Sequence, residues 1–459
     1  MSDGRLPKLA EIPAFAAYIA QGWDAPARTP GLVPGAARAS AAHRARLAEA
    51  LPGTTVVVSA GRAPVRSNDT AYDFRVDSDF YWLTGCVAEN AVAVVRDGAA
   101  TVYLPPPARP GDTGFFADAA YGELWVGPSP SLAEWSAALG AEVLPLPDFA
   151  GPPDGALVAG TLMAGTLMAG GAEPSQEVRR VLAELRMIKD EWEVAQLREA
   201  VDRTVEGFAA VLAEVPAAVA GGGERWLQGT FDRYARTYGN GPGYASIVGS
   251  GPHAPTLHWV RCDGPVLPDE LLLLDMGVET RAHYTADVTR TFPVSGAFSP
   301  AQRQVHDLVE RAHRAGLAQV APGRPFTAFH HAAMEVIARG LHDWGLLPVS
   351  VDEALSEHGQ HHRRYLICGI GHHLGLDVHD CASSRYEAYQ GARMAPGMVL
   401  TVEPGLYFHA HDLTVPPELR GIGVRIEDDL LVTEDGAENL SAALPIDATG
   451  LENWNKENV

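Results

Sequence analysis

Five side chains with metal-binding chemistry are spread over the C-terminal part of the chain. The segment 368–380, CGIGHHLGLDVHD, places a histidine in a glycine-punctuated apolar stretch, with acidic residues upstream and downstream of it. The candidate ligands are Asp275, Asp287, His372, Glu403 and Glu427. Oxygen donors with a single imidazole suit Mn²⁺, or Zn²⁺, Co²⁺ and Fe²⁺ by availability, better than they suit copper. The pattern therefore predicts a carboxylate-dominated metal site.

The two aspartates flank a predicted hairpin. Asp275 ends the apolar run LLLLDMG, and Asp287 opens ADVTRTF, with polar residues at about 279–283 between the two runs. Antiparallel pairing would bring the carboxylates side by side, where they repel each other unless a cation lies between them. Taken alone, the hairpin is equally compatible with two unrelated aspartates at strand ends.

Each glutamate lies in an apolar run, where an unpaired carboxylate is costly to bury. Glu403 follows MVLTV, and Glu427 lies in IGVRIEDDLL two residues after Arg425, which is an alternative salt-bridge partner. Two divalent cations about 3.5–4 Å apart would balance four such acids and leave one bridging hydroxide, as two-metal hydrolysis requires. Glu403, at the edge of such a site, could take and return the proton.

Composition limits the classes of partner. The chain has 459 residues, so two or three domains are expected, and its formal net charge is -22. This charge argues against nucleic-acid partners and anionic membranes, although solubility alone explains it as well. The four cysteines match neither a zinc motif nor a disulfide scaffold, and the N-terminal segment lacks a secretory pattern. A cytoplasmic protein is expected.

The N-terminal half predicts a mixed α/β domain. Residues 54–61 (TTVVVSAG) are typical of a buried strand, and residues 80–85 (FYWLTG) are taken as a second strand. Residues 90–104 form two apolar runs joined by Asp97-Gly98, which predicts a hairpin. Residues 131–140 are helix-like and precede the strand-like run EVLPL.

The segment 155–174 contains GTLMA twice in tandem, which is too short for a solenoid. It predicts a strand that continues into a glycine-rich linker, and it places a domain boundary near residue 174.

The C-terminal half predicts a sheet backed by helices. Asp190 with Glu193 forms a capping pattern at the start of one helix, and Ser299-Pro300 with Gln302 does so at another. Strand-like runs dominate after residue 365. The fold class expected for the whole chain is therefore α/β (α+β).

The motifs that carry the candidate ligands resemble a known family. In the contexts DMGVE, YTADVTRTFP, GIGHHLGLDVHD, TVEPGLY and RIEDD, the chain resembles the pita-bread metallopeptidases, and within them the Xaa-Pro group of aminopeptidase P and prolidase. Residues 66–85 are similar to the N-terminal domain of aminopeptidase P, and residues 185–201 to the linker helix of that group. The resemblance implies an aminopeptidase P-like domain over 1–174 and a pita-bread catalytic domain over 175–459.

The resemblance also implies roles for individual residues. It makes the five candidates the ligands of two divalent ions, with Mn²⁺ favoured. It makes His258, in SIVGSGPHAPTLHW, a substrate-pocket histidine, and His379 the donor of a hydrogen bond to the substrate carbonyl. Arg425 matches the arginine beside the second glutamate, so the implied catalytic residues are Glu403, His379, His258 and Arg425. For His258, a partly buried histidine with a backbone partner is the structural alternative.

One position departs from the family pattern. Members of the group commonly carry histidine four residues before the ligand histidine, as H-G-x-x-H, whereas this chain has Cys368 there. The missing imidazole is expected to line the substrate site rather than to hold metal. Metal binding should therefore survive, while proline recognition or turnover is weakened or redirected, unless the cysteine is a neutral variant. A thiol beside the metal would also be sensitive to oxidation.

The leading hypothesis is an aminopeptidase that releases the N-terminal residue from peptides with proline in the second position, because a large N-terminal domain can restrict access to a free amino terminus. A prolidase, which cleaves only Xaa-Pro dipeptides, is the alternative with the same chemistry. A homologue impaired by Cys368 is more distant. A metal-free binding protein and a methionine aminopeptidase are disfavoured by the complete ligand set and by the extra domain. The resemblance further suggests a dimer or tetramer in which a neighbour's N-terminal domain closes each active site.

Overall fold

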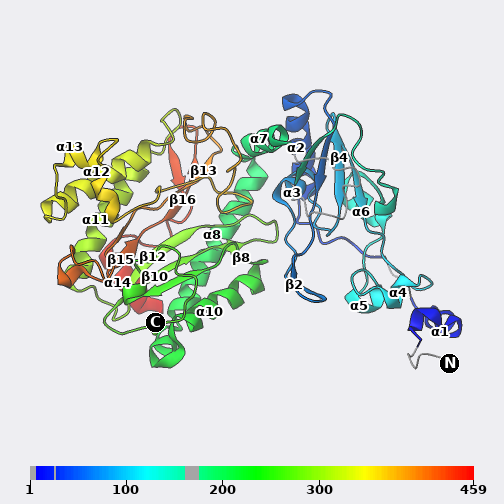
Figure 1. Ribbon diagram of the computed structural model, residues 1–459, viewed down its shortest axis with the longest axis horizontal. Coiled ribbons are helices and arrows are strands. Elements are labelled where there is room, and N and C mark those ends of the chain that lie inside the picture. The colour runs from blue at the N-terminus through cyan, green and yellow to red at the C-terminus, as the bar shows by residue number, and fades with distance from the viewer. Residues whose placement is uncertain (1–6, 25–26, 161–174, 459) are drawn as a thin grey trace. The chain divides into compact units, whose positions relative to one another are not determined.

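The computed structural model describes residues 7–24, 27–160 and 175–458 (Figure 1). Two compact units divide within helix α7 (Gln176–Arg186), between Leu182 and Ala183. Most of the tandem GTLMA segment and the predicted boundary at residue 174 lie outside the described residues, and that boundary stays a prediction. Among the described residues, no single helix is long and apolar enough to cross a membrane, and only the bent pair Glu191–Leu212 with Val215–Tyr238 passes that test jointly.

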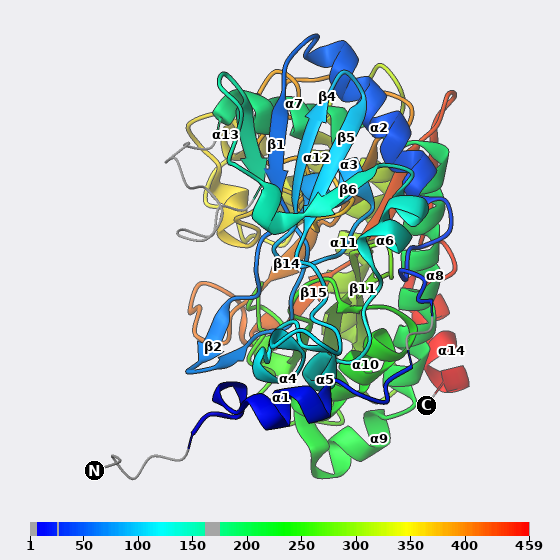
Figure 2. The ribbon, with the colours of Figure 1, turned by 90° about the vertical axis from the view of Figure 1, so that its right-hand side faces the viewer.

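The first unit is built on a five-stranded sheet, part of which is seen in Figure 2. Its strand order is β6-β5-β4-β1-β7, with parallel pairing in the two outer pairs and antiparallel pairing within. The strands are β1 (Val56–Ser59), β4 (Val92–Arg96), β5 (Ala99–Leu104), β6 (Glu142–Pro145) and β7 (Leu157–Gly160). Asp97 and Gly98 both have positive φ, 49° and 82°, as a two-residue hairpin turn demands. The predicted strand at 54–61 and the hairpin at 90–104 are thus confirmed.

The second strand predicted in this unit is wrong, because residues 80–85 belong to helix α3 (Ser78–Thr84) and its C-cap. Aromatic residues favour strands on average, but that preference depends on packing. Here the carboxylate of Asp77 accepts hydrogen bonds from the backbone N–H groups of Asp79 and Phe80, and so caps the helix. Gly85, at φ 68°, ends it. The buried aromatic face then packs inside the unit.

Short elements complete the first unit. Helix α6 (Leu132–Leu139) confirms the predicted helix, and Ser131 with Glu134 forms its capping box. The remaining elements are η1 (Leu9–Glu11), α1 (Pro13–Ile19), α2 (Ala36–Ala50), β2 (Val65–Ser67), β3 (Thr70–Ala71), α4 (Gly114–Ala117), α5 (Glu123–Val126) and η2 (Leu146–Asp148).

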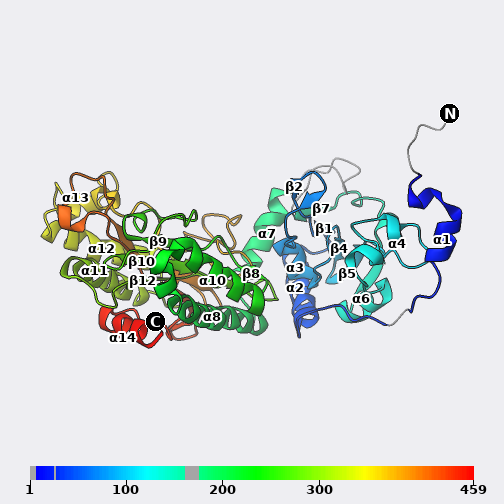
Figure 3. The ribbon, with the colours of Figure 1, turned by 90° about the horizontal axis from the view of Figure 1, so that it is seen from below.

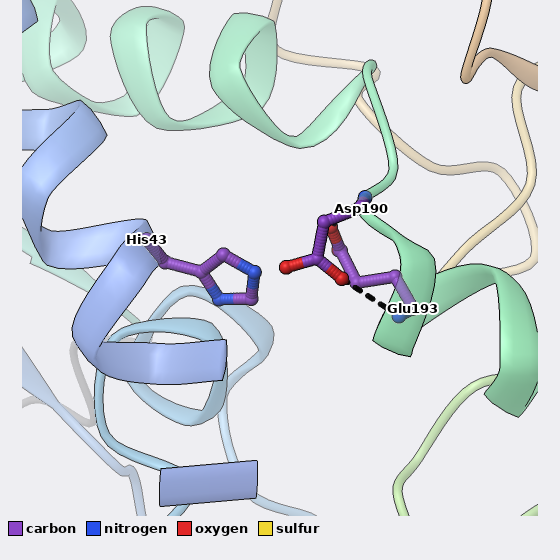
Figure 4. Close-up of side chains that lie close together, drawn as sticks. All are labelled: His43, Asp190 and Glu193. Carbon is purple, nitrogen blue, oxygen red and sulfur yellow. Dashed lines mark hydrogen bonds between the residues drawn. The ribbon is translucent and has the colours of Figure 1, made fainter. Parts of the chain in front are cut away.

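Long helices cover the second unit. Helix α8 (Glu191–Leu212) begins with the predicted capping box, in which the backbone N–H of Glu193 donates to Asp190 (Figure 4). Helix α11 (Pro300–Leu317) begins with the predicted box of Ser299 and Gln302. The other helices are α9 (Val215–Ala217), η3 (Ala218–Gly222), α10 (Gly223–Tyr238), η4 (Gly251–His253), α12 (Ala328–Asp343), α13 (Val351–Leu355), η5 (His361–Arg364), η6 (Pro417–Leu419) and α14 (Ala448–Asn458).

Short antiparallel sheets form the centre of the second unit. The order β12-β10-β9 makes one sheet and β13-β16-β17 another, and β14-β15 and β11-β8 form two-stranded sheets. An isolated bridge between Thr289 and Glu427 joins the sheets. The strands are β8 (Gly241–Pro242), β9 (Ile247–Ser250), β10 (Leu271–Met276), β11 (Val278–Glu279), β12 (Val288–Pro293), β13 (Val399–Val402), β14 (Gly405–Tyr407), β15 (Gly423–Arg425), β16 (Asp428–Val432) and β17 (Ala437–Asn439).

One continuous apolar core lies between these strands and the helices. It includes Leu272 and Phe292 from the strands and Val305, Leu308 and Ile337 from helices α11 and α12, all of them buried. Figure 3 shows helices α8 and α14 on one side of strands β10 and β12. Because the helices cover one face, the polar residues of the strands are left to gather on the other.

Candidate metal centre

The hairpin of β10 and β12 places both candidate aspartates on one face. The register pairs Asp275 with Thr289, so Asp287 is the diagonal neighbour of Asp275, two residues along. The backbone N–H of Asp287 donates to Oδ2 of Asp429 at 3.1 Å, which fixes the chain just before β12. The predicted side-by-side arrangement of the two aspartates is therefore present, as a diagonal pair.

Both candidate glutamates lie where one strand ends and the next begins. Glu403 is between β13 and β14, and Glu427 is between β15 and β16. Glu427 donates its N–H to the carbonyl of Thr289 at 3.1 Å, and the hydroxyl of Thr289 donates to Oε2 of Glu427 at 2.7 Å. These bonds hold Glu427 against β12, beside the aspartates.

His372 joins the carboxylates from a loop. Its backbone N–H donates to the Thr401 hydroxyl at 3.2 Å, which ties the loop to β13. Its Nε2 lies 3.3 Å from Oδ2 of Asp287 and 3.5 Å from Oε1 of Glu403. Three atoms that could ligate a metal lie within 4.8 Å of one another, one each from Asp287, His372 and Glu427. Residues separated by 140 positions in sequence thus form one cluster.

Arg425 connects the cluster to Asp275, the other candidate aspartate. Its guanidinium donates to Oδ2 of Asp275, to the hydroxyl of Tyr407 at 3.0 Å and to the hydroxyl of Thr289 at 3.0 Å. Tyr244 donates to the other oxygen of Asp275 at 2.6 Å. The salt bridge considered as an alternative for Glu427 is instead made to Asp275. Neither Tyr244 nor Tyr407 was predicted from the sequence as part of the site.

The electrostatics of the cluster favour a cation. Burial raises the pKa of Glu403 to about 7, and it raises the pKa of Glu427 and of Asp275 as well, with neighbouring carboxylates adding to the shift. Burial alone would lower the pKa of His372, but the hydrogen bond to Asp287 and the charge of Glu403 raise it to about 9. Divalent cations would balance these like charges, so the donor set fits a site for divalent metal ions.

The two other predicted histidines, His379 and His258, are exposed. The ring of His379 meets that of His372 edge-on, with centroids 4.4 Å apart, and the residue is exposed. Partial desolvation of its ring, and then the charges of His372 and His258, lower the pKa of His379. His258 is exposed, unlike the partly buried histidine considered as the alternative.

Cys368 is partly buried and packs at the edge of the core. Burial and then the charge of Glu403 raise the pKa of its thiol to about 11. At neutral pH the side chain is therefore a neutral thiol beside the cluster. That Cys368 lines the substrate site stays a prediction.

A buried ion cluster behind His379 was not foreseen. Asp380 accepts hydrogen bonds from Nζ of Lys189 at 3.1 Å and from the guanidinium of Arg186. These cations hold the pKa of Asp380 well below its usual range, although burial alone would raise it. Two features of the sequence could have indicated this cluster: the acid immediately after His379 in VHD, and the two basic residues in RMIK.

Family comparisons match both units. Residues 195–434 match metallopeptidase family M24, and residues 40–151 match the N-terminal domain of aminopeptidase P.

Curated relatives match most of the chain. It is 47% identical over 427 residues to Xaa-Pro aminopeptidase 1 of Streptomyces coelicolor, covering 90% of this chain and 86% of the relative. It is 31% identical to Xaa-Pro aminopeptidase of Escherichia coli, covering 86% and 91% of the two chains.

Solved structures agree with these relatives. Aminopeptidase P from E. coli with the inhibitor Pro-Leu superposes with a TM-score of 0.79 at 28% identity, covering 92% of this chain and 98% of that one. The Zn-substituted E. coli enzyme in complex with product gives the same TM-score and identity, covering 92% of this chain and 99% of that one.

Proposed function

Because the chain belongs to metallopeptidase family M24, we propose that it hydrolyses the Xaa-Pro bond at the amino terminus of peptides. The observation that carries this proposal is the single cluster formed by Asp287, His372 and Glu427, which Glu403 and Asp275 complete. The relatives that share both units are named Xaa-Pro aminopeptidases.

The five clustered side chains would hold two divalent cations, which would polarise the scissile carbonyl and lower the pKa of an attacking water. Arg425 and Tyr244 fix the orientation of Asp275 from opposite sides, as partners behind a metal ligand usually do. Thr289 does the same for Glu427. Hydrogen bonds from residues of the short sheets therefore fix the orientation of Asp275 and Glu427.

Proton transfer is assigned to Glu403. Its side chain is 18% exposed, whereas that of Asp287 is 8% exposed, so it lies at the open edge of the cluster. A carboxylate there can accept a proton from water and return it to the leaving proline nitrogen. His379, exposed and edge-on to His372, is placed to donate a hydrogen bond to the substrate carbonyl, and His258 contacts the substrate from the loop that follows β9.

The finer properties are also proposals. Mn²⁺ is the metal that we propose, because the donors are mostly carboxylate oxygens. All four cysteines are free thiols, which is typical of a reducing compartment and supports a cytoplasmic protein. A homo-oligomer, as a dimer or tetramer, is proposed from the family resemblance.

An aminopeptidase is favoured over a prolidase, because the relatives carry that name and the N-terminal domain is of the aminopeptidase P type. The test compares Ala-Pro-Pro with Ala-Pro, using Mn²⁺-loaded protein. Cleavage of the tripeptide with release of alanine supports the proposal. Cleavage of the dipeptide alone would assign a prolidase. If neither is cleaved, Cys368→His shows whether the cysteine impairs turnover.

A further inference from the structure

Helix α10 carries a glutamate whose carboxylate is fully enclosed. Glu224, in the first turn, is 0% exposed and accepts four hydrogen bonds, each 2.8 Å long. Oε1 accepts from the backbone N–H of Ser250 and from Nδ1 of His253. Oε2 accepts from the indole N–H of Trp259 and from the backbone N–H of Gly264. Four donors on one carboxylate replace its hydration and fix its orientation.

All four donors belong to the segment 250–264, which contains His258. Ser250 and Gly264 are its two ends, and Trp259 directly follows His258. Two of the bonds come from the main chain, so Glu224 fixes the backbone of the segment and not only its side chains. One buried carboxylate thus closes a loop of 15 residues, counted from 250 to 264.

The 250–264 loop also packs directly against β15, the strand that carries Arg425. A Cβ atom added to Gly423, in β15, would lie 2.3 Å from the carbonyl carbon of Ala254, so the loop backbone lies directly on this strand. Inside the loop, the rings of His253 and Trp259 stack with centroids 4.0 Å apart. The loop is therefore held between Glu224 on one side and β15 on the other.

We propose that Glu224 is a positioning residue for Xaa-Pro hydrolysis, because it holds the 250–264 loop in the conformation that presents His258 to the substrate. The inference rests on the proposed function, in which His258 contacts the substrate. Glu224 itself touches neither the substrate nor the metal ligands. Its effect on the reaction passes through the loop.

Glu224→Gln tests this role with little change in side-chain volume. An amide has one acceptor oxygen, and its NH₂ group would face groups that now donate, so at least one N–H donor loses its partner even if the His253 ring changes tautomer. Trp259→Phe is the milder variant, since it removes one of the four bonds and keeps an aromatic ring against His253. Glu214→Gln is the matched control, because Glu214 accepts a similar 2.8 Å indole bond, from Trp226, outside the loop.

The assay measures kcat and KM for Ala-Pro-Pro with full-length, Mn²⁺-loaded protein, together with bound metal and melting temperature. Glu224→Gln should lower kcat/KM by about 10- to 100-fold, as small misplacements of substrate-contacting groups do, while bound metal per chain stays at the wild-type value. Trp259→Phe should show a smaller loss in the same direction. Glu214→Gln should stay within about twofold of wild type.

A double-mutant cycle with His258→Ala separates positioning from general stability. If Glu224 acts through His258, adding Glu224→Gln to His258→Ala should change kcat/KM by less than about twofold. Additive losses, or a Glu224→Gln variant as active as wild type, would overturn the inference. If Glu224→Gln does not fold, the cycle is run with Trp259→Phe. An inactive wild type would instead refute the proposed function, whereas a fully active His258→Ala variant would overturn the inference, because His258 would then have no role for Glu224 to support.

Discussion

Replacement of Asp380 by asparagine would remove the negative charge at the centre of a buried ion cluster. The side chains of Asp380 and Lys189 are each 1% exposed, and that of Arg186 is 8% exposed. Asparagine keeps nearly the same volume but leaves two cations facing a neutral amide. Removal of one partner from such a cluster leaves an uncompensated buried charge, because the remaining groups cannot regain their hydration.

Breaking a buried pair in this way costs about 3–5 kcal/mol, which corresponds to a fall of about 10 °C in the melting temperature of a unit of this size. A surface pair joins the same two segments and provides the control. Arg385 donates to Glu184 at 2.6 Å, but the arginine side chain is 61% exposed. Glu184→Gln should therefore cost about 0–1 kcal/mol.

The effect of Asp380→Asn should also depend on pH. The folded-state pKa of Asp380 lies below its usual range, so the charge contributes stability above the unfolded-state pKa of about 3.9. That contribution is lost as the pH falls through the folded-state value. The difference between wild type and Asp380→Asn should thus be full at pH 7 and shrink below about pH 4.

Thermal melting of the chelator-stripped proteins, followed by circular dichroism at pH 7 and at pH 3, measures both effects, because protonated ligands would release bound metal at pH 3. Because Asp380 follows His379 directly, kcat/KM for Ala-Pro-Pro should fall in the same variant. An Asp380→Asn protein that melts within about 2 °C of Glu184→Gln at pH 7 would refute the reasoning that the buried pair carries the larger contribution.

Three further predictions concern the metal centre. Chelation should lower the melting temperature, because the clustered carboxylates lose their counter-charges, and added Mn²⁺ should restore it. An unchanged melting temperature would mean that the candidate carboxylates do not form one metal site. Arg425→Lys cannot reproduce three directed bonds and should weaken metal binding about 10- to 100-fold in a metal titration, whereas an unaltered affinity would remove Arg425 from the ligand support. Iodoacetamide should alkylate Cys368 before the three buried cysteines, and the reaction should be slow at pH 7 and faster as the pH approaches the raised pKa of the thiol, about 11. Mass spectrometry identifies the alkylated cysteine, and labelling of Cys262 before Cys368 would contradict the greater exposure of Cys368.

Local sequence signals predicted much of the fold. Capping boxes at Asp190 and Ser299 correctly marked two long helices, and Asp97-Gly98 marked a hairpin, because each depends on neighbouring residues only. The fold class was also predicted correctly. The strand predicted at 80–85 was wrong because the aromatic composition was weighed without the cap at Asp77, which starts helix α3.

The candidate ligands could be selected from sequence because carboxylates within apolar runs are costly without a partner. The structure brings these residues together. Their supporting residues could not be selected in this way. Glu224 lies in an ordinary polar helix start, and its four donors are 26 to 40 positions away. Tyr244 and Tyr407 reach the centre only through the pairing of short strands, and the sequence pattern does not encode that pairing locally.

We propose that one cluster of five residues binds the metal with which this protein hydrolyses the Xaa-Pro bond. The direct measurement is the release of alanine from Ala-Pro-Pro by chelator-stripped protein titrated with Mn²⁺, with bound metal determined at each point. We expect no release without metal and a rise in activity that saturates at about two ions per chain. Saturated metal binding without release of alanine, or full activity of the stripped protein, would contradict it.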